Sequence, residues 1–104
     1  MAEPFTPSGE VVSVGPGGLT QTTTVIKAPS LKVVRLVIPA GKDIPEHAAP
    51  GDITVHCLAG AVEFTADGRT NRLTPGQLIY LTVGVRHALK GIEDAVVLVT
   101  AVSR

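Results

Sequence analysis

Three histidines carry most of the chemistry that this sequence could perform. They are His47, His56 and His87, and an imidazole can act as a metal ligand or as a general acid or base near neutral pH. The single cysteine, Cys57, has no second cysteine with which to close an internal disulfide. None of the four serines lies in the strand-turn-helix setting of an activated nucleophile. The histidines are therefore the candidate functional groups.

Short extended segments separated by turns must position these histidines. Fifteen valines, six isoleucines and eleven threonines favour strands, whereas eleven glycines and eight prolines interrupt almost every window in which a helix could form. We therefore predict an all-β protein. The predicted strands are, in order, 11–14, 22–27, 31–38, 53–58, 61–66, 69–73, 78–81, 87–89 and 95–102.

Two of these patterns predict more than the extent of the strands. Asp67-Gly68 is typical of a two-residue turn with positive φ, so the segments on either side of it should pair as a hairpin. Segments 31–38 and 95–102 are apolar at odd and even positions alike. Because a sheet with one face in water should alternate, we expect a second sheet or a partner subunit to cover the outer face of these segments.

Length and charge exclude several classes of protein. A chain of 104 residues can bury one core, so we predict a single domain, with residues 1–10 as an N-terminal arm and 11–104 as the folded barrel. Nine basic and nine acidic side chains give no net charge, which disfavours nucleic acid or an acidic membrane as a partner. Since there is neither a signal peptide nor an apolar run of about 20 residues, we expect a soluble, cytoplasmic protein.

Glycines and histidines recur at two fixed spacings. The first is G-x5-H from Gly41 to His47, followed by a strand that ends at Gly60, and the second is G-x5-T-V-G-x2-H from Gly76 to His87. These spacings resemble the two motifs of the cupin superfamily, G-x5-H-x-H-x3,4-E-x6-G and G-x5-P-x-G-x2-H-x3-N. The resemblance covers nearly the whole folded chain. It implies a small single-domain jelly-roll barrel, or double-stranded β-helix, with both histidines at the same end of one cavity.

The sequence departs from this pattern at half of the metal-ligand positions of the family. His47 falls on the first ligand histidine and His87 on the last. Ala49 stands at the second histidine position, however, and Ile53 at the glutamate position. Two imidazoles are a weak ligand set for zinc and lack the carboxylate of the two-histidine, one-carboxylate triad that suits iron. Asp52, one residue before the glutamate position, becomes a third candidate metal ligand if a bulge turns it inward.

Other side chains are assigned to the cavity or excluded from it by strand alternation. Because successive side chains point to opposite faces, Cys57 should be a small buried hydrophobe and His56 should face outward. Arg35 and Tyr80 could each point into the cavity or lie outside it. The predicted ligand pocket includes four residues from separate segments: Arg35, Ala49, Ile53 and Tyr80.

Three functions stay open at this point. The first is a binding module that holds a small, largely apolar molecule in the barrel, either with a divalent metal (Fe, Mn, Ni or Zn) weakly held at His47 and His87 or without a metal. The second, implied by the resemblance, is a metal-dependent oxygenase or isomerase in which Asp52 or water completes the coordination. The third is a barrel kept for structural contacts alone. The segments that are apolar on both faces also favour a homodimer.

Overall fold

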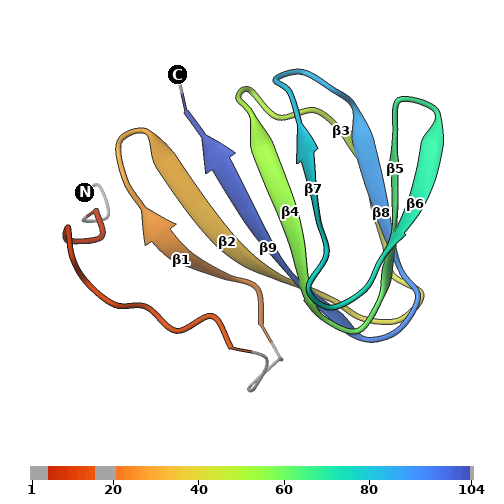
Figure 1. The fold of residues 1–104 in the computed structure, drawn as a ribbon, viewed down its shortest axis with the longest axis horizontal. Coiled ribbons are helices and arrows are strands. Elements are labelled where there is room, and N and C mark those ends of the chain that lie inside the picture. Colours follow the sequence, from red (N-terminus) through yellow and green to blue (C-terminus); the bar gives the residue numbers. More distant parts are fainter. Residues whose placement is uncertain (1–4, 16–20, 104) are drawn as a thin grey trace.

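Short strands separated by turns fold into two facing β-sheets (Figure 1). The computed structural model describes residues 5–15 and 21–103. Within these residues, no helix has the length and hydropathy needed to cross a membrane. Over the same ranges the strands are β1 (Thr23–Lys27), β2 (Leu31–Ile38), β3 (Asp43–His47), β4 (Ile53–Ala59), β5 (Val62–Ala66), β6 (Arg69–Leu73), β7 (Leu78–Leu81), β8 (His87–Gly91) and β9 (Ala95–Val102).

The order of the strands defines the topology. The large sheet runs β1-β2-β9-β4-β7 and the small sheet runs β3-β8-β5-β6, and the paired strands are antiparallel. From β2 onward the chain passes from one sheet to the other at every connection except the β5–β6 hairpin. This is the topology of a jelly roll, or double-stranded β-helix. The predicted all-β jelly-roll class is confirmed.

The β5–β6 hairpin follows from its turn residues. Ala66 pairs with Arg69, which leaves Asp67 and Gly68 as the two-residue loop. Their φ angles are 51° and 72°, so both adopt the positive φ that a primed turn requires. The side-chain oxygens of Thr65 and Thr70 lie 2.9 Å apart next to this turn. The predicted hairpin is therefore confirmed in position and register.

One predicted strand is wrong, and one strand of the structure was not predicted. Residues 11–14 form no strand, although the arm contacts the large sheet through the N–H of Thr6, which donates to Lys27 O at 2.8 Å. β3 was not predicted because Pro45 interrupts it and four of its five residues are exposed, so that no alternation is visible. A proline is tolerated there because β3 is the edge strand of the small sheet. The predicted arm and barrel also include residues 1–4, 16–20 and 104, which lie outside the described residues.

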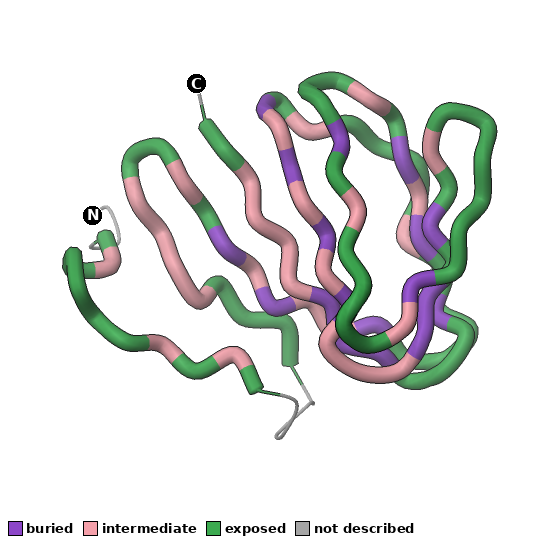
Figure 2. The backbone as a smooth tube through the Cα atoms, in the orientation of Figure 1, coloured by how far each residue is buried: buried purple, intermediate pink, exposed green. Residues whose placement is uncertain are grey.

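The core lies between the two sheets, where buried residues concentrate (Figure 2). Phe64 of β5 is the largest of the fully buried side chains. In β4, Ile53, Val55 and Cys57 face this core, while His56 lies on the outer face and is partly exposed. Burial raises the pKa of the Cys57 thiol, as expected of a small buried hydrophobe. The predictions for Cys57 and His56 are both confirmed.

Candidate functional site

The two motif histidines meet across neighbouring strands of the small sheet. His47 ends β3, His87 begins β8, and the antiparallel register makes them direct partners. Their ring centroids are 4.2 Å apart, with the ring planes inclined at 59°. The structure therefore brings together two residues that are far apart in the sequence, as the motif spacing predicts. Their meeting depends on the pairing of β3, which the strand pattern did not show.

Backbone carbonyls orient both imidazoles. Nδ1 of His47 lies 2.9 Å from Pro45 O, and Nδ1 of His87 lies 3.0 Å from Val85 O. In the neutral ring, Nδ1–H donates to this carbonyl, and Nε2 keeps its lone pair for a metal or a hydrogen-bond donor. Such a contact to the second ring nitrogen is usual for histidines that bind metals. In both residues the carbonyl comes from the residue two positions earlier.

The environments of the two histidines differ sharply. His47 is exposed, whereas His87 is only 3 % exposed and its ring stacks on Phe64 with centroids 5.5 Å apart and ring planes at 7°. Burial lowers the pKa of His87, the bond to Val85 O opposes this shift, and the nearby His47 lowers the pKa further. His87 therefore favours the neutral form, in which Nε2 is a ligand or an acceptor.

Stability should consequently fall when the pH drops below the ordinary histidine pKa of 6.5. Because the His87 pKa is lower in the folded than in the unfolded chain, the unfolded chain binds more protons in this window, and the free energy of unfolding rises with pH until it levels off above the unfolded pKa. His87→Gln should flatten this dependence. Urea unfolding between about pH 5.5 and 8, with a chelator present, measures both slopes. A His87→Gln slope equal to that of the wild type would contradict the prediction.

A cavity of about 280 Å³ lies between the sheets beside the histidines. Two of its eleven lining residues are His47 and His87, and the other nine are apolar. Ala49 and Ile53 line it, so the positions where cupins place two further metal ligands carry apolar side chains in the same space. The apolar residues of the lining are Val34, Leu36, Ile44, Ala49, Ile53, Val55, Leu89, Val99 and Ala101.

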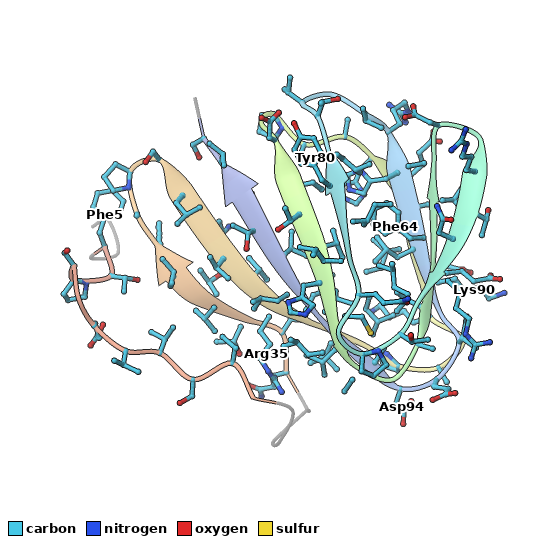
Figure 3. All side chains as sticks on the ribbon, viewed as in Figure 1. Phe5, Arg35, Phe64, Tyr80, Lys90 and Asp94 are labelled. Atoms are coloured by element: carbon cyan, nitrogen blue, oxygen red, sulfur yellow. The ribbon has the colours of Figure 1, made fainter. Side chains whose placement is uncertain are left out.

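The other two predicted pocket residues, Arg35 and Tyr80, do not line this cavity. Val34 and Leu36 of β2 face it, so Arg35 between them points to the outer side, where its Nε and Nη2 donate to Gly15 O at 3.3 and 3.2 Å. Tyr80 lies on the outer face of β7 and is 58 % exposed (Figure 3). Because successive side chains of a strand point to opposite faces, both residues lie outside the cavity. Their prediction as pocket residues is wrong.

Asp52 is not brought to the histidines either. Its Oδ1 accepts from Val83 N at 2.9 Å, and its backbone carbonyl accepts from Val102 N at 2.9 Å. The residue thus connects the start of β4 to the β7–β8 turn and to the end of β9. Among the described residues there is no group of three histidine, cysteine or acidic side chains that could hold a metal ion. Asp52 was a candidate metal ligand only if a bulge turned it inward, and its side chain instead accepts from Val83 N and does not line the cavity.

An ion pair beside the histidines was missed in the sequence. Arg86 Nε donates to Glu46 Oε1 at 2.8 Å, and each residue directly precedes one of the paired histidines. Both side chains are largely exposed, so the pair contributes roughly 0–1 kcal/mol to stability. The ion pair joins the residue before His47 to the residue before His87, so it links the two segments at the point where the histidines meet. In the sequence, the signal for this ion pair was that a residue of opposite charge directly precedes each motif histidine, in Glu46-His47 and Arg86-His87.

Two sheets that enclose an apolar cavity, with one histidine from each of two motifs at its wall, define a cupin-type barrel. The family model described as a cupin domain matches residues 34–103. The chain therefore belongs to the cupin family. Among curated proteins, none matches this chain.

Solved structures agree with this fold. A conserved protein of unknown function from Streptococcus pyogenes is similar with a TM-score of 0.79 and 25% identity, over 97% of this chain and 93% of that one. KdgF from Halomonas sp. is similar with a TM-score of 0.76 and 22% identity, over 96% and 94% of the two chains. A DMSP lyase from Ruegeria pomeroyi is similar with a TM-score of 0.72 and 25% identity, over 80% of this chain but only 46% of that one.

Proposed function

We propose that this cupin binds a small, largely apolar molecule in the cavity between its sheets. The observation that carries the proposal is the lining, which is apolar except for His47 and His87. Pockets that bury their ligand combine such walls with a few polar groups that orient it. At about 280 Å³, the cavity has room for a ligand of roughly ten non-hydrogen atoms, since a water molecule occupies about 30 Å³.

The histidines indicate which polar group the ligand carries. His87 is buried and its pKa is lowered, so it favours the neutral ring near pH 7. With Nδ1 engaged by Val85 O, the neutral ring offers Nε2 as an acceptor. The proposed ligand is therefore a short aliphatic or alicyclic molecule with one hydroxyl or amide donor.

Cyclohexanol, which has seven non-hydrogen atoms and one hydroxyl, is a suitable probe. We expect it to shift the amide NMR signals of cavity-lining residues in a saturable manner. Ala49→Phe fills the cavity and should weaken binding about tenfold or more. The matched control is Ala88→Phe in β8, because Ala88 pairs with Thr65 on the outer face of the small sheet. Equal binding by the two variants would contradict the proposal.

A weak divalent-metal site at His47 and His87 is the second part of this proposal. Imidazole suits Fe, Ni and Zn, and the carbonyls of Pro45 and Val85 orient both rings as such ligands require. The cavity adds no carboxylate to the two nitrogens, so water would have to supply the other positions. The donor set supports loose binding rather than a tightly held metal.

Metal-dependent catalysis is the second candidate function. It is supported by the similarity to a DMSP lyase at 25% identity and by two histidines whose Nε2 atoms are open. Oxygenase or isomerase chemistry, which the cupin resemblance suggests, would require a metal that stays bound during turnover. One metal per chain, retained through dialysis in protein purified without a histidine tag, would favour the enzyme over the binding module. A barrel kept for structure alone is less well supported, because the cavity is not filled by side chains.

A further inference from the structure

We infer that the molecule bound in the cavity is a small carboxylic acid, whose carboxylate pairs with Lys32 at the edge of the cavity. This rests on the proposed function, because it concerns the ligand of the same cavity. Val34 and Leu36 of β2 line the cavity, and β2 pairs with β9 residue by residue from Leu31 to Ile38. Lys32, two residues before Val34, therefore lies on the face of the strand that borders the cavity.

The pairing across the large sheet places Lys32 directly beside the cavity wall. Lys32 pairs with Ala101 of β9, and Ala101 pairs with Ile53 of β4. Ala101 and Ile53 both line the cavity. Opposed residues of antiparallel strands have Cα atoms about 4.5–5.5 Å apart, so the flexible side chain of Lys32 can extend its ammonium group over Ala101. The start of β2 and the end of β9 lie at the same end of the large sheet, at the top of Figure 1.

The stability of the sheet does not explain a lysine at this position. The cavity is lined by nine apolar residues and two histidines, and Lys32 is the charged residue next to this lining. On its other side Lys32 pairs with Lys27 of β1, and like charges in opposed positions weaken strand pairing. A lysine in an edge strand such as β1 discourages the addition of further strands. β2 is not an edge strand, however, because β1 and β9 flank it.

The ammonium group of Lys32 is accessible to a ligand. Lys32 is exposed, and it takes part in no ion pair between described residues. Two acidic residues directly precede cavity-lining positions, and both are engaged elsewhere. Glu46 accepts from Arg86 at 2.8 Å, and Asp52 accepts from Val83 N at 2.9 Å. These bonds leave the charge of Lys32 for an acidic group on the ligand.

A carboxylate suits this position better than a neutral or a cationic group. Its attraction to an ammonium group is stronger beside the low-dielectric wall of the cavity than on open surface. Because Lys32 is exposed, the carboxylate keeps part of its hydration while the apolar body of the ligand fills the cavity. Phosphate sites are commonly built at helix N-termini, and the described residues form no helix. Together with the donor inferred for His87, this makes the ligand a short hydroxy or amido acid.

Three probes that share a cyclohexane ring separate the possible head groups. They are cyclohexanecarboxylate (an anion), cyclohexanol (neutral) and cyclohexylammonium (a cation). NMR titration of the full chain measures each affinity at low ionic strength and about pH 8, where free imidazole is neutral, after a chelator has removed metal and been dialysed away. We expect the wild type to bind cyclohexanecarboxylate about fivefold more tightly than cyclohexylammonium. About 0.5 M salt should reduce this difference.

Replacing Lys32 tests its role directly. Lys32→Gln should weaken the binding of cyclohexanecarboxylate about fivefold and change that of cyclohexanol less than about twofold, because it removes the charge but not the cavity. Lys32→Arg keeps the charge and should bind both probes as the wild type does. Both variants should fold, since Lys32 is exposed.

The matched control is Lys90→Gln, which removes the same charge from another exposed position. Lys90 follows the cavity-lining Leu89 in β8, so it points to the outer face of the small sheet. Figure 3 shows Lys90 on the side of the molecule away from β1. This variant should bind all three probes as the wild type does.

The outcomes separate this inference from the proposed function. Equal affinity of the wild type for cyclohexanecarboxylate and cyclohexylammonium would overturn the inference, as would equal effects of Lys32→Gln and Lys90→Gln. Binding of cyclohexanecarboxylate that Ala49→Phe does not weaken would also overturn it, because the acid would then lie outside the cavity. If cyclohexanol binds in the cavity and Lys32→Gln has no effect on the acid, the inference alone fails. If no probe binds, the cavity function fails with it.

Discussion

Gly60→Ala is expected to lower the free energy of unfolding by roughly 3 kcal/mol or more. Gly60 follows β4 with a φ of +73°, and a Cβ built on it would lie 2.1 Å from Asp94 O and 2.7 Å from the Cα of Ala95. These are backbone atoms at the start of β9, so they cannot rotate away. The substitution must therefore separate β4 from the strand beside it in the large sheet, or strain both.

Gly68→Ala is the matched control for this effect. Gly68 has nearly the same φ, +72°, but no atom lies within 4 Å of the added Cβ. Both variants carry the penalty of about 1–2 kcal/mol for a side chain in the left-handed region, and only Gly60→Ala adds the steric overlap. Urea denaturation of the two variants measures the difference. Equal losses of stability would mean that the Gly60 turn relaxes freely, contrary to the packing described.

The double variant Ala49→His/Ile53→Glu should bind a divalent metal at least about 100-fold more tightly than the wild type. Both positions line the same cavity as His47 and His87, so the change adds an imidazole and a carboxylate to the existing pair. Because Ile53 is buried, a carboxylate there should cost about 3 kcal/mol or more of stability without metal. Metal at about 100 times its dissociation constant should restore about 2.7 kcal/mol.

Elemental analysis and thermal unfolding with and without Ni(II) or Zn(II) measure these effects in protein purified without a histidine tag. The wild type should retain less than about a tenth of a metal per chain after dialysis, and the double variant close to one. Adding His47→Ala to the double variant should reverse the gain, whereas His56→Ala should not. No gain in the double variant would show that the four positions do not converge. Stoichiometric metal in the wild type would instead favour the enzyme.

Much of the fold was predictable because its signals are local. Val, Ile and Thr favour extended backbone, Asp67-Gly68 specifies a primed turn, and alternation in β4 places Cys57 inside and His56 outside. β3 could not be predicted, because four of its five residues are exposed and Pro45 interrupts it. Its pairing with β8 comes from the closure of the small sheet rather than from its own residues.

The candidate site was predictable to a smaller extent. Motif spacing identified His47 and His87 and assigned Ala49 and Ile53 to the same cavity, and the structure brings these four together. Arg35 was misplaced because β2 is apolar on both faces, so its pattern does not indicate which face is inward. The direction of the Asp52 side chain was left open, because its partner, Val83, lies in a turn far away in the sequence.

By itself, the sequence determined the strand content, the tight turn and the two histidines that belong to one site, since each depends on residue type and short spacing. Only the tertiary structure decided which face of β2 points into the cavity. It also decided that the His87 ring is buried against Phe64, while His47 stays exposed. The physical reason is strand pairing, because contacts between distant strands depend on sheet closure and register, which no local pattern encodes.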